Sequence, residues 1–195
     1  MTGLLSPEAV DFGDPRIQQL QVAAARKGVT LDLRHLRPAT HNPTVEQIAL
    51  EMGCEVGQVV SSSLCLAPLP HGLMRPIVCL TAGCGEIAIE LLAAVSGEVD
   101  VRVATAREAR DVFNCLPGLV PAFGHGRDVS VVMDRDLGGY QWVWAPTGSA
   151  SAVFRISPST LRMLSNATVA PVVTTSRTRS VEGFDGAAVL GFGAA

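Results

Sequence analysis

A loop rich in glycine and proline leads directly into an apolar strand in the middle of the chain. Residues 112–137 read VFNCLPGLVPAFGHGRDVSVVMDRDL, with Pro117-Gly118, Pro121 and Gly124-His125 ahead of the apolar run. Proline fixes φ and glycine tolerates angles that other residues avoid, so the loop holds its N–H groups in a fixed arrangement. Such N–H groups bind carboxyl, carbonyl or phosphate oxygens without a catalytic side chain. The loop therefore predicts a binding site built largely from backbone.

Several residues around this loop can contribute to such a site, and each has an alternative interpretation. His125 either acts as a general acid or base or caps the loop by hydrogen-bonding to its backbone. Asp134 either fixes the end of the strand after the loop or contacts a substrate amine. Gly148, between two later strands, is expected to supply a positive-φ turn. Trp142 and Trp144 share one strand face, which favours packing, with base stacking as the alternative.

Three consecutive serines, Ser61 to Ser63, lie in an apolar segment typical of a strand. A nucleophilic serine needs a histidine–carboxylate partner and a sharp turn that exposes it, and neither accompanies this run. We therefore expect small strand residues whose side chains alternate between a pocket and the core.

The composition is that of a globular, mildly acidic chain. Of its 195 residues 48% are hydrophobic and 17% charged, and the net charge is −3. This charge argues against a domain that grips nucleic acid through a basic face, but allows a shallow contact with one RNA end. The late arginines that could form a modest RNA-facing patch, or only a solvated surface, are Arg155, Arg162, Arg177 and Arg179.

The cysteines and histidines show no metal-binding pattern. The five cysteines include no CxxC pair, and the four histidines lack ligand spacing. We see neither a signal peptide nor a run of 18 apolar residues, the length that a membrane span requires. The sequence therefore predicts reduced, buried thiols in a cytoplasmic protein, with no metal, no cofactor and no membrane association.

Apolar periodicity and capping residues predict an α+β domain. Asp14 before Pro15 and the pair Thr44 and Gln47 mark two helix starts, and Thr105 marks another. The expected helices are 15–28, 44–53, 87–95, 106–113 and 158–166. The expected strands are 31–36, 58–68, 76–82, 99–104, 129–134, 140–146, 152–157 and 167–173. Because strands and helices alternate irregularly, we predict a mixed, strongly curved, barrel-like sheet surrounded by helices.

From Thr44 to Val173 the chain resembles the YbaK/prolyl-tRNA-synthetase-associated family of aminoacyl-tRNA editing domains. In this chain, the segment VEQIALEMGCEVGQVV resembles the family's opening helix and the strand that leads to the family's active-site lysine. The next strand, turn and helix resemble PIVCLTAGCGEIAIELLAAVSG, and the helix and substrate loop resemble ATAREARDVFNCLPGLVPAFGH. The closing strands and helix resemble VSVVMDRDLGGYQWVWAPTGSASAVFRISPSTL. The pieces stand in the family's order with compatible spacings.

The resemblance implies hydrolysis of the ester between a small, wrong amino acid and the tRNA 3′-terminal ribose. Members act within prolyl-tRNA synthetase or in trans, on alanyl- or cysteinyl-tRNA of the proline class. The glycine loop is thought to hold the aminoacyl group, a lysine the terminal phosphate or ribose, and the ribose 2′-hydroxyl helps to position water. An aminoacyl ester is already activated, so orientation and oxyanion stabilisation suffice.

The chain departs from the family at the lysine. Aligned on 58–60, the family lysine falls on Ser61, and a shift of one residue gives Ser62; no lysine follows Lys27. A serine cannot replace the cationic reach of a lysine to phosphate. Phosphate anchoring would then fall to an arginine such as Arg127 or Arg155. The arginine and aspartate expected in the hairpin turn are Glu86 and Ala88.

The loop departs from the family at two positions. Leu119 replaces its second glycine and Ala122 its second proline, so the pocket is expected to be smaller or blocked. The loop residues that fit the family are Gly118, Val120, Pro121, Phe123, Gly124 and His125, and Asp134 and Gly148 also stand at expected places.

Together these observations predict an N-terminal leader and helix (1–28), an editing domain (29–174) and a flexible tail (175–195). The leading function is deacylation of mischarged tRNA in trans, with water as nucleophile and Gly118 and His125 as catalytic residues. The substrate-binding residues are expected to be Ser61, Ser62, Leu119, Val120, Pro121, Gly124, Asp134 and Gly148. The partners are a tRNA 3′ end and an aminoacyl-tRNA synthetase. The alternative is a catalytically silent relative that binds an amino acid, an aminoacyl ligand or a protein.

Overall fold

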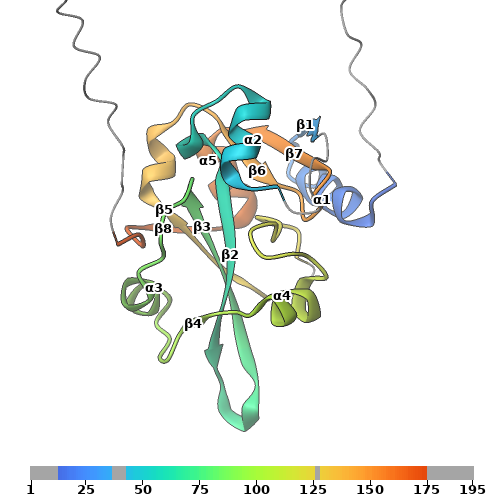
Figure 1. Cartoon of the computed structure of the whole chain (residues 1–195). Helices are drawn as coiled ribbons and strands as arrows, with labels where there is room; N and C mark the ends of the chain where they lie inside the picture. Colours follow the sequence, from blue (N-terminus) through green and yellow to red (C-terminus); the bar gives the residue numbers. More distant parts are fainter. Residues whose placement is uncertain (1–12, 37–42, 126–127, 175–195) are drawn as a thin grey trace, which may run out of the picture.

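The structure is a computed structural model, and it describes residues 13–36, 43–125 and 128–174. Within these ranges the chain forms five α-helices and eight strands, which confirms the predicted α+β class (Figure 1). The predicted leader up to residue 12 and the predicted tail, 175–195, lie outside the described residues. None of the helices described is long and apolar enough to cross a membrane.

All five predicted helices are present, although the first ends at Ala25 rather than at residue 28 and the third begins at Ile89 rather than at residue 87. They are α1 Pro15–Ala25, α2 Val45–Met52, α3 Ile89–Ser96, α4 Ala106–Phe113 and α5 Pro158–Ser165. Asp14 accepts a hydrogen bond from the backbone N–H of Arg16, and Thr44 and Gln47 form the predicted capping box. Gly53 ends α2 in the left-handed conformation. Each such cap stabilises its helix by about 1 kcal/mol, because it pairs backbone groups that the helix leaves unpaired.

The strands form two sheets. They are β1 Asp32–His35, β2 Val60–Pro68, β3 Met74–Ala82, β4 Arg102–Val103, β5 Ser130–Asp134, β6 Val143–Pro146, β7 Ala152–Ile156 and β8 Thr168–Ala170. A three-stranded antiparallel sheet has the order β1-β7-β6, and a five-stranded mixed sheet has the order β4-β2-β3-β5-β8. The long β2–β3 hairpin projects beyond the rest of the molecule in Figure 1.

The prediction of a single, strongly curved, barrel-like sheet is wrong. Closing a barrel needs a continuous ladder of hydrogen bonds around the whole sheet. Among the described residues, one isolated parallel bridge, Val59 to Trp144, joins the backbones of the two sheets, and neither sheet closes on itself. Alternation of apolar residues predicts strands but not which strands pair. The sequence pattern alone therefore could not show whether the strands close into a barrel.

Three different segments pair with one edge of β2 and its preceding residue, and this arrangement brings the glycine loop next to the strand. Val59, just before β2, bridges to Trp144 of the other sheet, and Ser62 bridges to Leu119 of the glycine loop. Further along, Cys65 pairs with β4. The other edge of β2 pairs with β3 along its whole length. The glycine loop therefore lies against β2 between the second sheet and β4.

The main core lies under these segments. Leu20 and Ala24 of α1, Leu64 of β2, Val120 of the loop and Phe154 of β7 belong to one buried cluster. Phe154 also meets Phe123 edge to face, with ring centroids 5.7 Å apart. Burial of such aliphatic and aromatic side chains contributes about 25 cal/mol per Å². The core thus fastens α1, the loop and both sheets to one another.

Candidate functional site

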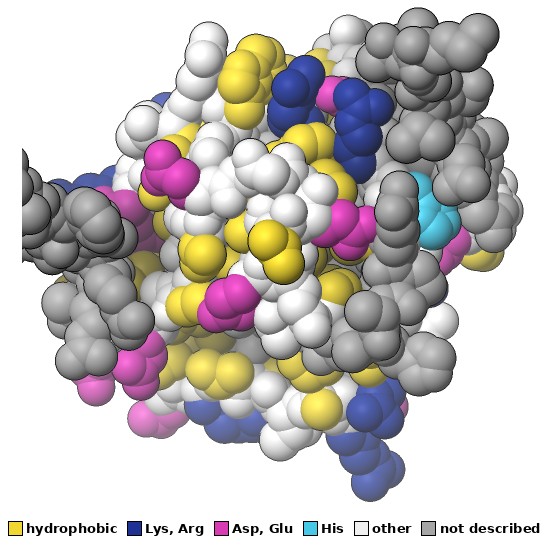
Figure 2. Space-filling view, turned by 45° about the horizontal axis from the view of Figure 1, so that its top comes forward, with side chains coloured by type: hydrophobic (Ala, Val, Ile, Leu, Met, Phe, Trp, Pro, Cys, Tyr) yellow, Lys and Arg dark blue, Asp and Glu magenta, His cyan; other side chains and the backbone are white. Residues whose placement is uncertain are grey.

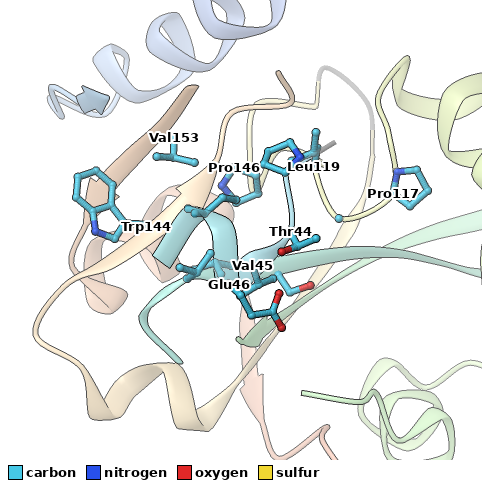
Figure 3. Close-up of a pocket in the computed structure, with 14 residues that line it drawn as sticks. Thr44, Val45, Glu46, Pro117, Leu119, Trp144, Pro146 and Val153 are labelled. Carbon is cyan, nitrogen blue, oxygen red and sulfur yellow. The ribbon is translucent and has the colours of Figure 1, made fainter. Parts of the chain in front are cut away.

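A cavity of about 270 Å³ opens between α2, the start of β2 and the glycine loop, and we call it the β2–loop cavity. Its walls also include the face of the three-stranded sheet that packs under α2. In Figure 3, Val45 and Glu46 lie opposite Leu119 and Pro146, and Trp144 and Pro117 lie at the two ends. The lining residues are Pro43, Thr44, Val45, Glu46, Ile48, Val59, Val60, Ser61, Pro117, Gly118, Leu119, Trp144, Pro146 and Val153.

The cavity brings together two sequence positions that lie far apart in the chain. Ser61, one of the two positions predicted for the family's lysine, lines it together with Gly118 and Leu119 of the loop. The bridge between Ser62 and Leu119 holds the loop against β2 at this point. Gly118 has a φ of 81°, a left-handed conformation that glycine adopts readily and other residues adopt at a cost. The backbone of the loop is thus fixed beside Ser61.

Ser61 and Ser62 have opposite environments because side chains alternate along a strand. Ser61 is half-buried and faces the cavity, whereas Ser62 is fully buried. The hydroxyl oxygen of Ser62 has no hydrogen-bond partner among the described residues. Of the two alignments, the one on Ser61 therefore corresponds to the position that lines the cavity.

Among the described residues that line the β2–loop cavity, Glu46 is the charged one; its side chain is exposed to solvent, and no motif in the sequence points to it. It follows Val45 in the first turn of α2 and accepts a hydrogen bond from the Cys84 thiol, with Sγ and Oε1 2.9 Å apart. This bond lowers the pKa of the Glu46 carboxyl, so the carboxylate is ionised at neutral pH. The capping box marks this end of the helix in the sequence, but only the fold shows what it faces.

The thiol environments partly differ from the prediction of buried cysteines. All five cysteines are free, and Cys65, Cys79 and Cys115 are buried. Cys54 is half-buried, and Cys84 is exposed. The hydrogen bond to Glu46, together with burial, raises the pKa of Cys84 to about 11, so its thiol stays protonated and donates.

No arginine or lysine lines the β2–loop cavity within the described part of the chain. Arg155 forms an ion pair with Asp32, with Nε and Oδ2 3.1 Å apart, and stacks over Trp142 on the exposed side of β7. Arg127 lies outside the described residues. Trp144 is buried and Trp142 is 44% exposed, so the two tryptophans have different environments. The described residues that line the β2–loop cavity therefore have a net negative charge, which comes from Glu46.

Figure 2 shows the surrounding face, turned so that the upper part of Figure 1, where α2 lies, comes forward. Acidic side chains stand across the middle of this face, between hydrophobic patches. Lysine and arginine side chains gather toward its upper and lower edges.

The other end of the loop lines a second cavity, also of about 270 Å³, which we call the α1–loop cavity. Its walls include Pro121, Gly124 and His125 together with Arg16 and Gln19 of α1. The Gln19 side-chain amide donates to the carbonyl of Gly124 at 2.7 Å. The predicted site residues of the loop are thus divided: Gly118 and Leu119 line one cavity, and Pro121, Gly124 and His125 line the other.

His125 is fastened to its own loop. Its Nε2 lies 2.5 Å from the carbonyl oxygen of Pro121, and its ring packs on Phe113 with centroids 5.0 Å apart. Burial lowers the pKa of His125 and the bond to Pro121 opposes that shift, so the imidazole is largely neutral at neutral pH.

Asp134, Gly148 and Val120 line neither cavity. Asp134 is buried, and its two carboxylate oxygens accept the backbone N–H groups of Asp136 and Val172, each at 2.9 Å. Gly148 has a φ of 92°, and an added Cβ would lie 3.4 Å from the Pro121 ring. Val120 is fully buried in the main core. In this structure these residues fix the ends of strands and the loop.

Comparisons with known proteins identify solved structures with a similar fold. A solved structure described as that of a candidate trans-editing enzyme for prolyl-tRNA synthetase is 29% identical, with a TM-score of 0.71, and covers 83% of this chain and 99% of its own. A scaffold protein used for computational epitope grafting is 27% identical, with a TM-score of 0.69 and the same coverage.

A third structure, of a hypothetical protein, shares the fold at 23% identity and a TM-score of 0.70, covering 79% of this chain and 98% of its own. No curated protein matches the sequence. The model of the family described as "aminoacyl-tRNA editing domain" matches residues 39–164, which include α2, β2 and the glycine loop. The chain therefore belongs to the aminoacyl-tRNA editing domain family.

Proposed function

We propose that the chain hydrolyses, in trans, the ester of a mischarged tRNA that carries a small amino acid such as alanine, cysteine or serine. The tRNA belongs to the proline class, and an aminoacyl-tRNA synthetase is the expected functional partner. The observation that carries the proposal is the β2–loop cavity, which is lined both by Ser61, the position onto which we align the family's lysine, and by Gly118 and Leu119 of the loop. Membership of the family and the likeness to a candidate trans-editing enzyme support it.

The proposed chemistry uses water as the nucleophile and the loop as a cradle. Gly118 and its neighbours hold the ester through backbone groups that the fold has already fixed. An aminoacyl ester is activated, so orientation and electrostatic stabilisation of the developing oxyanion provide the rate without a serine nucleophile. His125 lies in the other cavity and bonds to Pro121, so we assign it the role of positioning the loop.

The second candidate function is binding without hydrolysis. The described lining of the β2–loop cavity holds no cation, and Leu119 occupies space beside Ser61. A relative that lost the lysine could retain the pocket for an amino acid, an aminoacyl ligand or a segment of a partner protein.

Deacylation of alanyl-, cysteinyl- and seryl-tRNA by the wild type, Ser61→Lys and Ser61→Met tests the proposal. We expect the wild type to release at least one of the three amino acids. Ser61→Lys should increase the rate by adding a cation beside the ester, and Ser61→Met, which has similar length without charge, should not. Gly118→Ala should lower the rate by roughly tenfold, because its φ of 81° strains any residue with a Cβ by about 1–2 kcal/mol and so disfavours the loop conformation that holds the ester.

Two other outcomes distinguish the two candidate functions, hydrolysis and binding without hydrolysis. Activity of Ser61→Lys alone would mean that the pocket is intact and lacks only the cation. Silence of all variants at high protein concentration would reject the deacylase and favour the binding protein.

A further inference from the structure

The charge of the β2–loop cavity has a consequence for what it binds. Glu46 contributes a carboxylate to a lining otherwise made of apolar and uncharged side chains. A cavity with this lining repels a phosphate or a carboxylate and attracts an ammonium group. The terminal phosphates of a tRNA should therefore stay outside it.

The Glu46 carboxylate is held in a fixed place. The capping box of Thr44 and Gln47 fixes the first turn of α2, and the Cys84 thiol donates to Oε1 at 2.9 Å. Carboxylates are also favoured in the first turn of a helix, where backbone N–H groups carry partial positive charge. Protonation is disfavoured, since the hydrogen bond from Cys84 lowers the pKa of Glu46. A preformed anion thus stands at the solvent-exposed part of the lining that also includes Ser61.

We propose that Glu46 binds the α-ammonium group of the aminoacyl ester and thereby selects esterified over free amino acids in the β2–loop cavity. The assignment of an ester as ligand rests on the proposed function. An aminoacyl ester carries a single positive charge, whereas a free amino acid also carries a carboxylate that Glu46 would repel. The product of hydrolysis would therefore bind more weakly than the substrate and leave the site.

The apolar part of the lining limits which amino-acid side chain the ligand can have. Val45, Ile48, Val59 and Leu119 contribute hydrophobic surface to the lining, which suits a short aliphatic or thiol side chain. A volume of about 270 Å³ must hold both the side chain and the reacting ester, so bulky side chains are excluded.

The kinetic test compares alanyl-tRNA with N-acetyl-alanyl-tRNA, which lacks the positive charge. We expect the wild type to prefer the free amine, and Glu46→Gln to raise KM for alanyl-tRNA by roughly tenfold, because charge-assisted hydrogen bonds are about twice as strong as neutral ones. KM for the acetylated substrate should stay within about twofold of wild type. Glu90→Gln is the matched control, since Glu90 stands at the same position of α3, is exposed, and lines neither cavity.

A binding test works even if no ester is hydrolysed. Alaninamide, N-acetylalaninamide and free alanine are titrated into wild type and Glu46→Gln, with binding followed by NMR shifts of the Gly118 and Ser61 amides. Tighter binding of alaninamide than of the other two, lost in Glu46→Gln, supports the inference even where deacylation fails. Equal binding of alaninamide by both proteins, or equal binding of N-acetylalaninamide and alaninamide by the wild type, overturns it.

Discussion

The buried hydroxyl of Ser62 is an unusual feature of strand β2. It is fully buried and has no hydrogen-bond partner among the described residues. A buried polar group without a partner costs about 1–3 kcal/mol, since it has lost its hydrogen bonds to water.

We therefore predict that Ser62→Ala raises the free energy of unfolding by about 1 kcal/mol, because alanine removes the unpaired oxygen and changes little else. Urea unfolding monitored by circular dichroism measures it. Ser63→Ala is the control: Ser63 is half-buried in the same strand, so the change in strand propensity is the same. A loss of stability in Ser62→Ala relative to the control would show that the hydroxyl has a partner.

At the level of single residues, the sequence offered candidate site positions but could not show where their side chains point. Ser61 and Ser62 were both candidates for the family's lysine position, and only the register of β2 against β3 shows that Ser61 faces the cavity. Glu46 was missed because a carboxylate in the first turn of a helix is common, and its importance depends on a loop far away in the chain.

Helix α1 and the glycine loop form one packed unit. Arg16 donates to the carbonyl of Asn114 at 3.2 Å, and Gln19 donates to that of Gly124 at 2.7 Å. Gly124 has a φ of 78°, and an added Cβ would lie 3.2 Å from the Cβ of Ala23. The helix and the loop approach so closely because this residue has no side chain.

Gly124→Ala should lower the free energy of unfolding by about 2–3 kcal/mol, from left-handed strain of about 1–2 kcal/mol and from the contact with Ala23. Gly28→Ala is the matched control: its φ is 73° and an added Cβ would meet nothing within 4 Å, so it has only the strain. Thermal and urea unfolding give both values. Equal losses in the two variants would contradict a tight contact between α1 and the loop.

The elements show what local sequence can determine. Asp14, Thr44 and Thr105 start helices where the sequence predicted, because capping depends on neighbours within three residues. The predicted strand 99–104 is only Arg102–Val103, because just two residues of it pair with β2. Pairing is a long-range property, and for the same reason the sequence could not show that the strands form two open sheets.

The whole molecule is acidic, with a net charge of −3, and the described lining of the β2–loop cavity holds no cation. A tRNA bound to such a surface releases few counterions. We expect log KM for aminoacyl-tRNA to change with log salt concentration with a slope of at most about 2, since each neutralised phosphate of a single strand contributes roughly 0.7.

Initial rates of deacylation at several potassium chloride concentrations measure this slope. The same titration with a minimal aminoacyl-adenosine substrate, which has no phosphates, should be nearly flat. A steep slope with tRNA would mean that a basic surface engages it, with Arg177 and Arg179 as candidates outside the described residues.

The walls of the β2–loop cavity belong to parts of the fold that single bridges connect. Val59 meets Trp144 at one bridge and Ser62 meets Leu119 at another, whereas β2 and β3 pair along nine positions. Breaking an isolated bridge costs far less than opening a ladder, because no neighbouring hydrogen bonds are lost with it. Small shifts of the loop or of the second sheet can therefore occur at these two bridges while the central hairpin stays intact, and the shared core keeps them too small to admit a bulky side chain.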